Sequence, residues 1–424
     1  MPRALIAMSG GVDSSVAALL MQQAGYQCVG VTMRLHSDTA WSETSCCANN
    51  AVIKYSALDH AAINDAAQVC AHLGIEHQVW DFSTLFTEQV IMPFVAAYRR
   101  GETPNPCIDC NRQLKFGALL AAARQAGFQC LVTGHYARTS WDVERQVYRL
   151  LKASLPDKDQ SYVLYQLSQS DLAFVSFPLG ELSKDQVRQI ALDAGLPTAE
   201  REDSQDICFI EDDYQSFLKR VSSAEDNQEL DNREHAGSYS SHECSAGNNS
   251  SEHSTSDSHV GGRAYCADCN LNQHNAEHLA LADSSGEIVD SAGNVLGYHQ
   301  GISDFTIGQR RGLGIAVGHP LYVTQIDADT KRVTVGEENE LLHKKALLRG
   351  FTSPVLQELQ PVMEVQAKYR YRSIAAPARL VMFDDGRWEV QFYESQKALT
   401  PGQALVCYQG DQLIAGGTIS EARG

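Results

Sequence analysis

The chain has 424 residues, of which 43% are hydrophobic, so it is long enough to form two or three domains, each with its own core. Its formal charge of −18 argues against a generally basic nucleic-acid-binding protein, but residues 222–283 supply half of that charge, with eleven acidic and two basic side chains, and a basic face elsewhere stays compatible with it. The N-terminal residues lack the apolar region of a signal peptide, and no apolar run is long enough to span a membrane. We therefore expect a cytoplasmic protein without a membrane partner.

The first motif is a glycine- and serine-rich loop, Ser9–Ser15, which follows the apolar run Ala4–Met8 and precedes helical spacing. Gly10 and Gly11 permit a sharp turn with exposed N–H groups, and a helix start attracts anions, so the loop is typical of a phosphate site. It is not a Walker A loop, because no Gly-Lys-Ser/Thr follows and no lysine from that motif reaches the β- and γ-phosphates. Asp13 is the candidate ligand for magnesium. The alternative is a purely structural turn.

Strands and helices alternate after this loop. Residues 28–33 and 78–82 have the composition of strands, and residues 62–74 and 83–100 have helical spacing. This alternation predicts βαβ units around a parallel sheet, with ligands beyond the carboxyl ends of the strands. The loop at Ser9–Ser15 is at such an end.

Twelve scattered cysteines in a chain of this size indicate reactive thiols or metal ligands more than disulfides. Cys107 and Cys110 follow two prolines, and we expect a helix to begin near Asn111. That would place Cys110 close to a helix N-terminus, with Arg112 and Lys115 nearby, and both effects favour the thiolate. The alternative is that Cys110 only packs as a small apolar residue.

Three further polar stretches stand out. His135 follows a predicted strand at residues 130–133, Lys158–Tyr162 precedes a predicted apolar helix, and Cys208 lies in a polar loop. Alone, the histidine is compatible with a structural role and the lysine stretch with a solvated helix start.

Taken together, the motifs resemble those of the tRNA-specific 2-thiouridylases, in the same order and over nearly the whole chain except residues 222–283. They are Ser-Gly-Gly-Val-Asp-Ser-Ser, Thr-Pro-Asn-Pro-Cys-Ile-Asp-Cys-Asn, Thr-Gly-His-Tyr-Ala, Lys-Asp-Gln-Ser-Tyr, Ser-Gln-Asp-Ile-Cys-Phe and Phe-Thr-Ile-Gly-Gln-Arg-Arg-Gly-Leu-Gly. The resemblance implies ATP-dependent adenylation of the C2 oxygen of the wobble uridine, followed by sulfur transfer from a protein persulfide.

We predict an α/β fold with a parallel-sheet ATP-pyrophosphatase domain at 1–204, a central domain at 205–320 and an antiparallel β-barrel at 321–424. The barrel is indicated by short alternating strands between turns. Residues 222–283 are too polar to bury a core, and we interpret them as a disordered insertion. Their Cys266 and Cys269, with six histidines, give only a weak zinc signal.

The resemblance also assigns roles to individual residues. Cys208 would carry the persulfide, and Cys110 would be the second catalytic cysteine, closing a disulfide with it after transfer. The adenosine site would be formed by Ala7, Met8, Ser9, Gly10, Gly11, Val12, Asp13, Ser14, Met33 and Gly134. Contacts to tRNA would come from His135, Lys158, Asp159, Gln160, Arg370, Tyr371 and Gln403. The implied cofactors and partners are ATP, Mg²⁺, tRNA and a sulfur-donor or relay protein, with no DNA and no resident metal.

Two departures from the family pattern leave alternatives open. Residues 49–58 look longer than usual, and Cys107 stands where many relatives have Asp. If Cys107, Cys110 and Cys208 converge, three thiolates could hold an iron–sulfur cluster with one open iron. Other readings are a different adenylating synthetase with the same loop, which would not need paired cysteines, and a non-catalytic nucleotide-dependent tRNA-binding protein.

Overall fold

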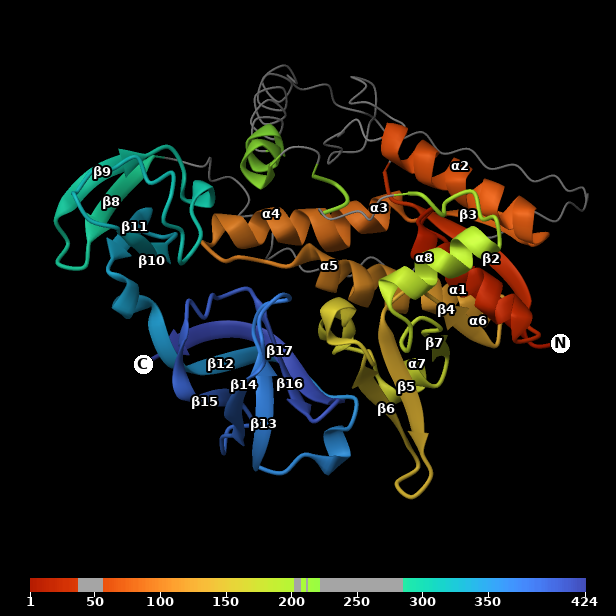
Figure 1. Cartoon of the computed structure of the whole chain (residues 1–424). Helices are drawn as coiled ribbons and strands as arrows, with labels where there is room; N and C mark the ends of the chain where they lie inside the picture. Colours follow the sequence, from red (N-terminus) through yellow and green to blue (C-terminus); the bar gives the residue numbers. More distant parts are fainter. Residues whose placement is uncertain (37–55, 202–206, 211–212, 222–284) are drawn as a thin grey trace, which may run out of the picture.

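The computed structural model describes residues 1–36, 56–201, 207–210, 213–221 and 285–424 (Figure 1). The paired cysteines 46 and 47, the predicted insertion at 222–283 and its weak zinc signal at Cys266 and Cys269 lie outside the described residues.

The N-terminal domain is built on a parallel sheet of five strands in the order β3-β2-β1-β4-β7. The strands are β1 (Arg3–Ala7), β2 (Gln27–Arg34), β3 (Glu76–Asp81), β4 (Cys130–Val132) and β7 (Val175–Ser176). Because alternate residues of a strand point to opposite faces, Ala4 and Ile6 of β1 pack in one core cluster and Leu5 packs in another. The predicted parallel sheet is confirmed.

Helices cover both faces of this sheet (Figure 1). The cluster of Ala4 and Ile6 includes side chains of α1 (Val12–Gln23), α2 (Ser56–Leu73) and α8 (Lys184–Asp193). On the face of Leu5 the helical segment consists of α5 (Pro106–Asp109), η2 (Cys110–Leu119) and α6 (Leu120–Gln125), which is continuous along the chain. A second continuous segment consists of α3 (Ser83–Phe86), η1 (Thr87–Ile91) and α4 (Met92–Arg99).

The predicted start of the helix after the prolines is wrong. The helix begins at Pro106, four residues before Cys110 and not at Asn111, because Asn105 is the N-cap and its side chain accepts a hydrogen bond from the Cys107 N–H at 3.1 Å. Asn at the N-cap followed by Pro at the first helical position is a favourable helix start. Cys110 therefore lies in the second turn of the helix.

The C-terminal barrel is antiparallel, as predicted, and closes through pairing of β12 with β17. Its strands are β12 (Leu342–Thr352), β13 (Val362–Lys368), β14 (Ala376–Met382), β15 (Trp388–Lys397), β16 (Ala404–Gln409) and β17 (Gln412–Arg423). A hairpin of the N-terminal domain, β5 (Ala137–Asp142) and β6 (Val147–Lys152), extends the same sheet, since Leu151 pairs with Gln412. The hairpin thus ties the first domain to the barrel.

A separate sheet lies between these units in the chain, in the order β10-β11-β8-β9. Its strands are β8 (Gly286–Asp290), β9 (Val295–His299), β10 (Tyr322–Asp327) and β11 (Arg332–Gly336). We predicted that residues 321–336 open the barrel, and this is wrong: β11 pairs in parallel with β8. Alternation of apolar residues indicates a strand but does not name its partner.

Short helical turns complete the described chain. They are η3 (Pro156–Lys158), η4 (Ser161–Leu164), α7 (Gln169–Leu172), η5 (Ile302–Asp304), η6 (Glu338–Leu341), η7 (Leu356–Glu358) and a helix over 214–221. The apolar helix expected after Lys158–Gln160 is therefore only the 3₁₀ turn η4. Within the described residues, no helix is both long and apolar enough to cross a membrane.

Candidate active site

The loop between β1 and α1 is braced by its own serines. The Ser9 N–H donates to Ser14 Oγ at 3.2 Å, and the hydroxyls of Ser14 and Ser15 donate to the Gly11 carbonyl at 3.1 and 2.8 Å. Gly10 has φ +73, and a Cβ there would come within 2.7 Å of the Ala62 carbonyl oxygen. The loop can therefore pass this close to α2 only with glycine at this position.

The predicted nucleotide residues lie together at the carboxyl edge of the sheet. Ala7 pairs with Val31 on β2, the strand that carries Met33, while Gly134 follows β4. A Cβ at Gly134 would lie 2.9 Å from the Ser14 nitrogen, so glycine lets the end of β4 approach the start of α1. The remaining members, Met8, Ser9, Gly10, Gly11, Val12, Asp13 and Ser14, form the loop and the first turn of the helix. This cradle of helix N–H groups, hydroxyls and tight glycines fits a phosphate chain.

Two side chains from distant parts of the sequence hold Asp13. The Tyr136 hydroxyl donates to Asp13 Oδ1 at 2.8 Å, and Lys184 Nζ lies 2.7 Å from the same oxygen. Neither Tyr136 nor Lys184 is among the residues predicted for the site. Tyr136 stands in the Gly-His-Tyr motif, and Lys184 follows the Ser183 cap of α8, so both had a local signal but none for their partner.

Further contacts fix the loop from the end of the N-terminal domain. Arg201 donates to the Gly10 carbonyl at 3.0 Å and forms an ion pair with Asp65 of α2. The Thr198 hydroxyl donates to Ser15 Oγ at 3.0 Å. Residues 198–201 therefore contribute to the shape of the phosphate loop, which sequence reasoning also missed.

Cys110 is buried, and this corrects the predicted thiolate. Its side chain packs in an aromatic cluster with Phe94 and Phe209. Burial raises the pKa of the Cys110 thiol, and the Lys115 cation only partly opposes this. The helix start that was expected to lower the pKa lies four residues earlier, at Pro106.

Cys208 lies next to this cluster, at its solvent-facing side. Phe209 packs edge-on against Phe86 and Phe94, with ring centroids 5.6 and 5.5 Å apart, and this places the neighbouring Cys208 beside the helix of Cys110. Cys208 is exposed to solvent, yet desolvation by the surrounding protein and the charges of Cys110 and Cys107 raise the pKa of its thiol to about 12. The structure thus brings together the two cysteines that the sequence placed 98 residues apart.

A resident metal centre finds no support in the positions of these thiols. Within the described ranges, which include Cys107, Cys110 and Cys208, no three side chains of His, Cys, Asp or Glu are grouped so that they could hold a metal ion. Among the described residues, the three thiols are therefore not arranged as an iron–sulfur cluster would need.

Two of the predicted tRNA-binding residues are buried. His135 packs between Phe116 and Phe177, its Nδ1 lies 2.8 Å from the Thr133 hydroxyl, and burial together with the Lys115 cation holds its pKa well below 6.5. Asp159 accepts hydrogen bonds from Ala153 N–H and from the Ser161 N–H and hydroxyl at 3.0–3.1 Å. In this conformation both side chains are buried and make their hydrogen bonds within the protein.

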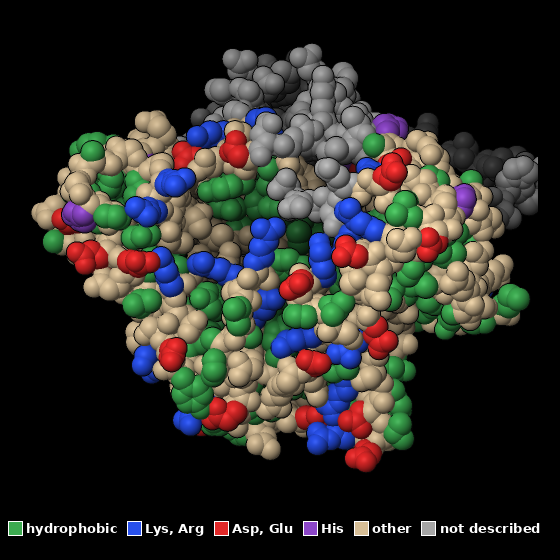
Figure 2. Space-filling view, in the orientation of Figure 1, with side chains coloured by type: hydrophobic (Ala, Val, Ile, Leu, Met, Phe, Trp, Pro, Cys, Tyr) green, Lys and Arg blue, Asp and Glu red, His purple; other side chains and the backbone are tan. Residues whose placement is uncertain are grey.

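The other predicted tRNA residues lie around the junction of the three units. Lys158 is exposed, and Gln160 accepts from the Tyr136 N–H at 2.9 Å and hydrogen bonds to the Tyr371 side chain. Arg370 and Gln403 line one pocket together with residues 306–309 of the middle domain. Figure 2 shows lysine and arginine side chains gathered around the central hollow at this junction.

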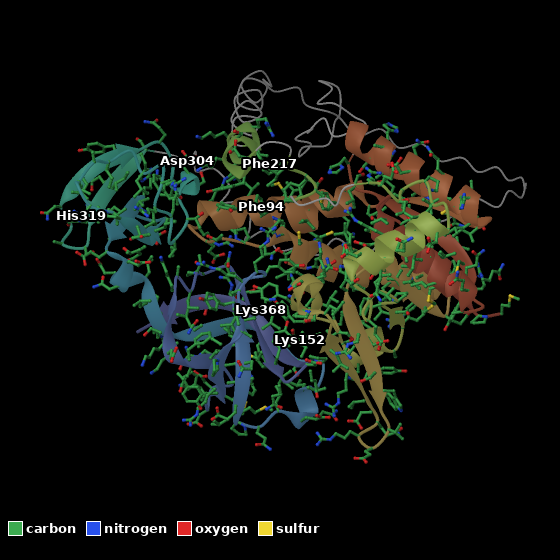
Figure 3. The ribbon with its side chains drawn as sticks, viewed as in Figure 1. Phe94, Lys152, Phe217, Asp304, His319 and Lys368 are labelled. Carbon is green, nitrogen blue, oxygen red and sulfur yellow. The ribbon has the colours of Figure 1, made fainter. Side chains whose placement is uncertain are left out.

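Lysine and tyrosine side chains alternate where the barrel meets the hairpin. Lys368 Nζ lies 5.8 Å from the Tyr162 ring centroid and 5.7 Å from that of Tyr371, and Lys152 lies 4.5 Å from that of Tyr408 (Figure 3). Burial is the main cause that lowers the pKa of Lys368; the Asp159 carboxylate opposes it and Lys152 adds to it. Cations beside aromatic faces suit the binding of phosphates and unstacked bases.

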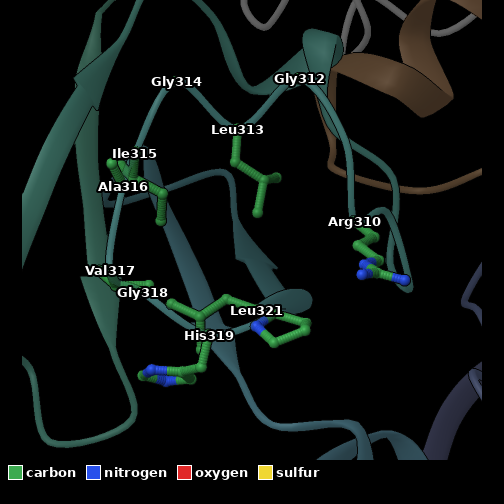
Figure 4. A pocket seen from close by; sticks show the side chains of 11 residues that line it. Arg310, Gly312, Leu313, Gly314, Ile315, Ala316, Val317, Gly318, His319 and Leu321 are labelled. Atoms are coloured by element: carbon green, nitrogen blue, oxygen red, sulfur yellow. The ribbon is translucent and has the colours of Figure 1, made fainter.

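The last sequence motif lies apart from the phosphate loop. Its residues 310–314 continue into a loop to Leu321 that lines a hollow of the middle domain (Figure 4). Arg310 and His319 are its charged or titratable members.

These features define the class of protein: a nucleotide-binding parallel α/β domain with a phosphate loop and two cysteines beside it, joined to two β domains. Family models match each part, a tRNA methyl transferase HUP domain at 2–212, a tRNA methyl transferase PRC-barrel domain at 277–337 and an aminomethyltransferase beta-barrel domain at 350–419.

Curated relatives match along the whole length. The chain is 40% identical over 420 residues to a tRNA-specific 2-thiouridylase MnmA of Desulforamulus reducens, covering 99% of this chain and 97% of the relative. It is 41% identical over 424 residues to one of Acidithiobacillus ferrooxidans, with 98% of both chains covered, and 38% identical over 419 residues to one of Moorella thermoacetica, again with 98% of each. The chain belongs to the tRNA-specific 2-thiouridylase family.

Proposed function

We propose that this protein is an ATP-dependent tRNA 2-thiouridylase that replaces the C2 oxygen of the wobble uridine with sulfur. The observation that carries this is the combination of a phosphate loop and two adjacent cysteines in one chain of this family. The proposed substrate places the enzyme with tRNA in the cytoplasm.

Activation comes first, because oxygen at C2 is a poor leaving group. The C2 oxygen attacks the α-phosphorus of ATP, the bond between that phosphorus and the bridging oxygen breaks, and its electron pair leaves on pyrophosphate. The N3 proton of the uridine is lost to solvent. The phosphate loop holds the polyphosphate through its N–H groups and hydroxyls, and Asp13 would hold magnesium, which neutralises phosphate charge.

Sulfur transfer follows at the two cysteines. The terminal sulfur of a Cys208 persulfide attacks C2, and AMP leaves with the C–O bond electrons. The Cys110 thiolate then attacks the Cys208 sulfur, so that a disulfide forms and the electron pair of the broken S–S bond stays on the sulfur at C2. A thiol reductant reopens the disulfide, and a sulfur-donor protein reloads Cys208.

The electrostatics of the site bear on the second step. Burial raises the pKa of both thiols. The charge of Lys115 acts in the opposite direction and lowers the thiol pKa of Cys107, Cys110 and Cys208. Lys115 is therefore the group that supports the attacking thiolate.

We further propose that tRNA binds across the central hollow. The exposed Arg370 and Tyr371 at the end of β13 and Gln403 of the neighbouring pocket line its barrel side, and Lys158 lies on the first domain. The target base would have to leave its stack to present its C2 edge. His135 and Asp159 support the surrounding loops and reach tRNA only if these loops move.

The test is mass analysis of nucleosides from unmodified tRNA after incubation with ATP, a persulfide sulfur donor, a thiol reductant and the protein. We expect 2-thiouridine, AMP and pyrophosphate in equal amounts. Pyrophosphate without sulfur incorporation, persisting in the Cys110/Cys208 double variant, would favour another adenylating synthetase. Binding of ATP and tRNA without pyrophosphate would leave only a binding protein.

A further inference from the structure

A lysine reaches the phosphate loop from the far end of the N-terminal domain. The loop motif itself contains no lysine, but Lys184, the first residue of α8, places its Nζ 2.7 Å from Asp13 in the first turn of α1. The position is firmly built. Ser183 caps α8 by accepting from the Gln186 N–H at 3.1 Å, and Val187 and Ala191 of α8 pack with Val16 and Ala17 of α1.

The two oxygens of the Asp13 carboxylate have different surroundings. Lys184 and the Tyr136 hydroxyl both bind Oδ1, at 2.7 and 2.8 Å, and among the described residues no hydrogen bond is made to Oδ2. The Lys184 side chain is 12% exposed and that of Asp13 is 33% exposed, so the pair lies at the edge of the cradle, partly open to an incoming ligand. Oδ2 is therefore the oxygen of Asp13 that would bind magnesium.

Positive groups of the described chain lie around Asp13. Lys184 stands at the N-terminus of its own helix, where the helix dipole disfavours a cation, and the N-terminus of α1 adds a second positive end. Arg201 and its partner Asp65 balance each other on the other side of the loop. Among the described residues, Asp13 thus lies beside Lys184 and near the N-termini of two helices, a setting in which a polyphosphate can bind.

We propose that Lys184 is a further catalytic residue, which leaves Asp13 and binds the pyrophosphate as it departs. This rests on the proposed adenylation. When the bond from the α-phosphorus to the bridging oxygen breaks, that oxygen gains negative charge, and the ammonium group stabilises the charge without giving up its proton. Tyr136 is a positioning residue, since its hydroxyl keeps Asp13 in place after Lys184 has moved. Lys184 thereby does what the lysine of a Walker A loop does, from a helix 171 residues away.

The experiment measures tRNA-dependent pyrophosphate release at saturating tRNA, as a function of ATP and magnesium. We expect Lys184→Met to lower kcat about 100-fold, in the range for loss of one charged group that stabilises a transition state, with the KM for ATP changed by less than about threefold. Lys184→Arg should restore at least about a tenth of the rate, because the cation returns. Lys344→Met, which removes an exposed barrel lysine and the same charge, should keep the wild-type rate.

Magnesium separates catalysis from a purely structural role. If Lys184 only steadies Asp13, Lys184→Met and Tyr136→Phe share one defect, a raised magnesium requirement, and high magnesium repairs both. We expect high magnesium to repair Tyr136→Phe only. Repair of Lys184→Met, or a rate equal to that of Lys344→Met, would overturn the inference. Should Lys184→Met not fold, Lys184→Gln, which keeps a donor to Asp13, gives the same kcat comparison. Absence of pyrophosphate release by the wild-type protein would instead contradict the proposed function itself.

Discussion

At the scale of single residues, the candidate site combines a loop that is braced by its own side chains with side chains from distant parts of the sequence. The bracing of Ser9–Ser15 uses only hydrogen bonds within the motif, whereas Asp13 depends on Tyr136 and Lys184, which are 123 and 171 residues away. The two cysteines are likewise joined by packing, through the cluster around Phe209.

Cys110→Ser and Cys208→Ser should each reduce 2-thiouridine formation to background while ATP binding survives, because each sulfur is needed in the transfer and neither touches the phosphate loop. The readout is the 2-thiouridine content of tRNA from a strain that carries only the variant enzyme. Cys107→Asp is the matched variant, since it replaces the exposed neighbouring thiol with a carboxylate, and it should retain most activity. Normal 2-thiouridine with Cys208→Ser would refute the assignment.

The thiol pKa values give a pH prediction. The Cys208 thiol, with a pKa raised to about 12, stays protonated at neutral pH, and its thiolate fraction grows about tenfold for each pH unit below that value. Alkylation of Cys208 by iodoacetamide, followed by peptide mass spectrometry, should therefore still accelerate between pH 9 and 10. A thiol with the ordinary value would level off there, and such a plateau would contradict the raised pKa. Lys115→Gln should slow the reaction at every pH tested.

The sequence predicts a site residue when the groups that position this residue are its neighbours in the chain. The phosphate loop is recognisable because glycines, serines and the helix start are neighbours in the chain. Lys184 has no such signal, since a capped helix start does not reveal which loop it meets. We predict contacts to tRNA from His135 and Asp159, but both side chains are buried and hydrogen bond to their near neighbours, Thr133 and Ser161. The Asn105–Pro106 cap, in contrast, has a local signal, because Asn followed by Pro is a favourable helix start.

At the scale of elements, the N-terminal domain and the barrel are joined by a few specific contacts. Arg349 of β12 binds Glu102, which follows α4, through two hydrogen bonds of 2.7 Å, and the Thr103 N–H donates to the Pro401 carbonyl at 2.9 Å. The hairpin β5–β6 adds the ion pair of Arg149 with Glu358, and Arg149 also pairs with Asp142 inside the hairpin. These contacts fix the barrel against the segment that leads to Cys110.

Arg349→Ala should destabilise the protein by about 1–2 kcal/mol, because the partly buried Glu102 would keep only its ion pair with the more exposed Arg100. Burial raises the pKa of Glu102, but hydrogen bonding and charge from Arg349 outweigh it and lower the pKa below 4.5. The pair therefore stabilises the fold above the unfolded-state pKa of Glu102, and this contribution is lost as the pH falls through the lower folded-state value. Thermal unfolding from pH 7 to pH 3 should show the variant and wild type converging at the acid end.

The control for this pair is Arg387→Ala. Arg387 binds Asp385 with both side chains more than half exposed, so its loss should leave the stability nearly unchanged. Equal destabilisation by the two substitutions would mean that the domain contact at Glu102 contributes nothing of its own.

The residues that follow β13 are expected to contribute to tRNA binding. Arg370→Ala should weaken tRNA binding about three- to tenfold and reduce its salt dependence, because an exposed guanidinium that contacts phosphate contributes through counterion release. Affinity is measured by filter binding at several salt concentrations, with Arg387→Ala, on a distant turn of the barrel, as the charge-matched control. ATP binding should be unchanged in both. An unaltered salt dependence with Arg370→Ala would place the tRNA elsewhere.

At the scale of the whole molecule, the acidic chain and the anionic substrate have to be reconciled. The formal charge is −18, yet lysine and arginine side chains gather around the central hollow where the domains meet (Figure 2). The field at the hollow is therefore set by these nearby cations, while charges farther away than a Debye length of about 8 Å are screened at physiological salt. Residues 222–283 hold half of the net negative charge, and the phosphate loop, the cysteines and the barrel all lie outside them in sequence.

Replacement of residues 222–283 by a short Gly/Ser linker should leave thiolation per bound tRNA unchanged, because no residue of the proposed site lies in this segment. It removes eleven acidic and two basic side chains, so the formal charge falls from −18 to −9. Repulsion of tRNA should weaken accordingly, and we expect about two- to tenfold tighter binding at low salt, with the difference vanishing as salt screens the charges. Single-turnover thiolation and binding across a salt series separate the two effects. A loss of single-turnover rate that saturating tRNA does not restore would assign the segment a part in catalysis.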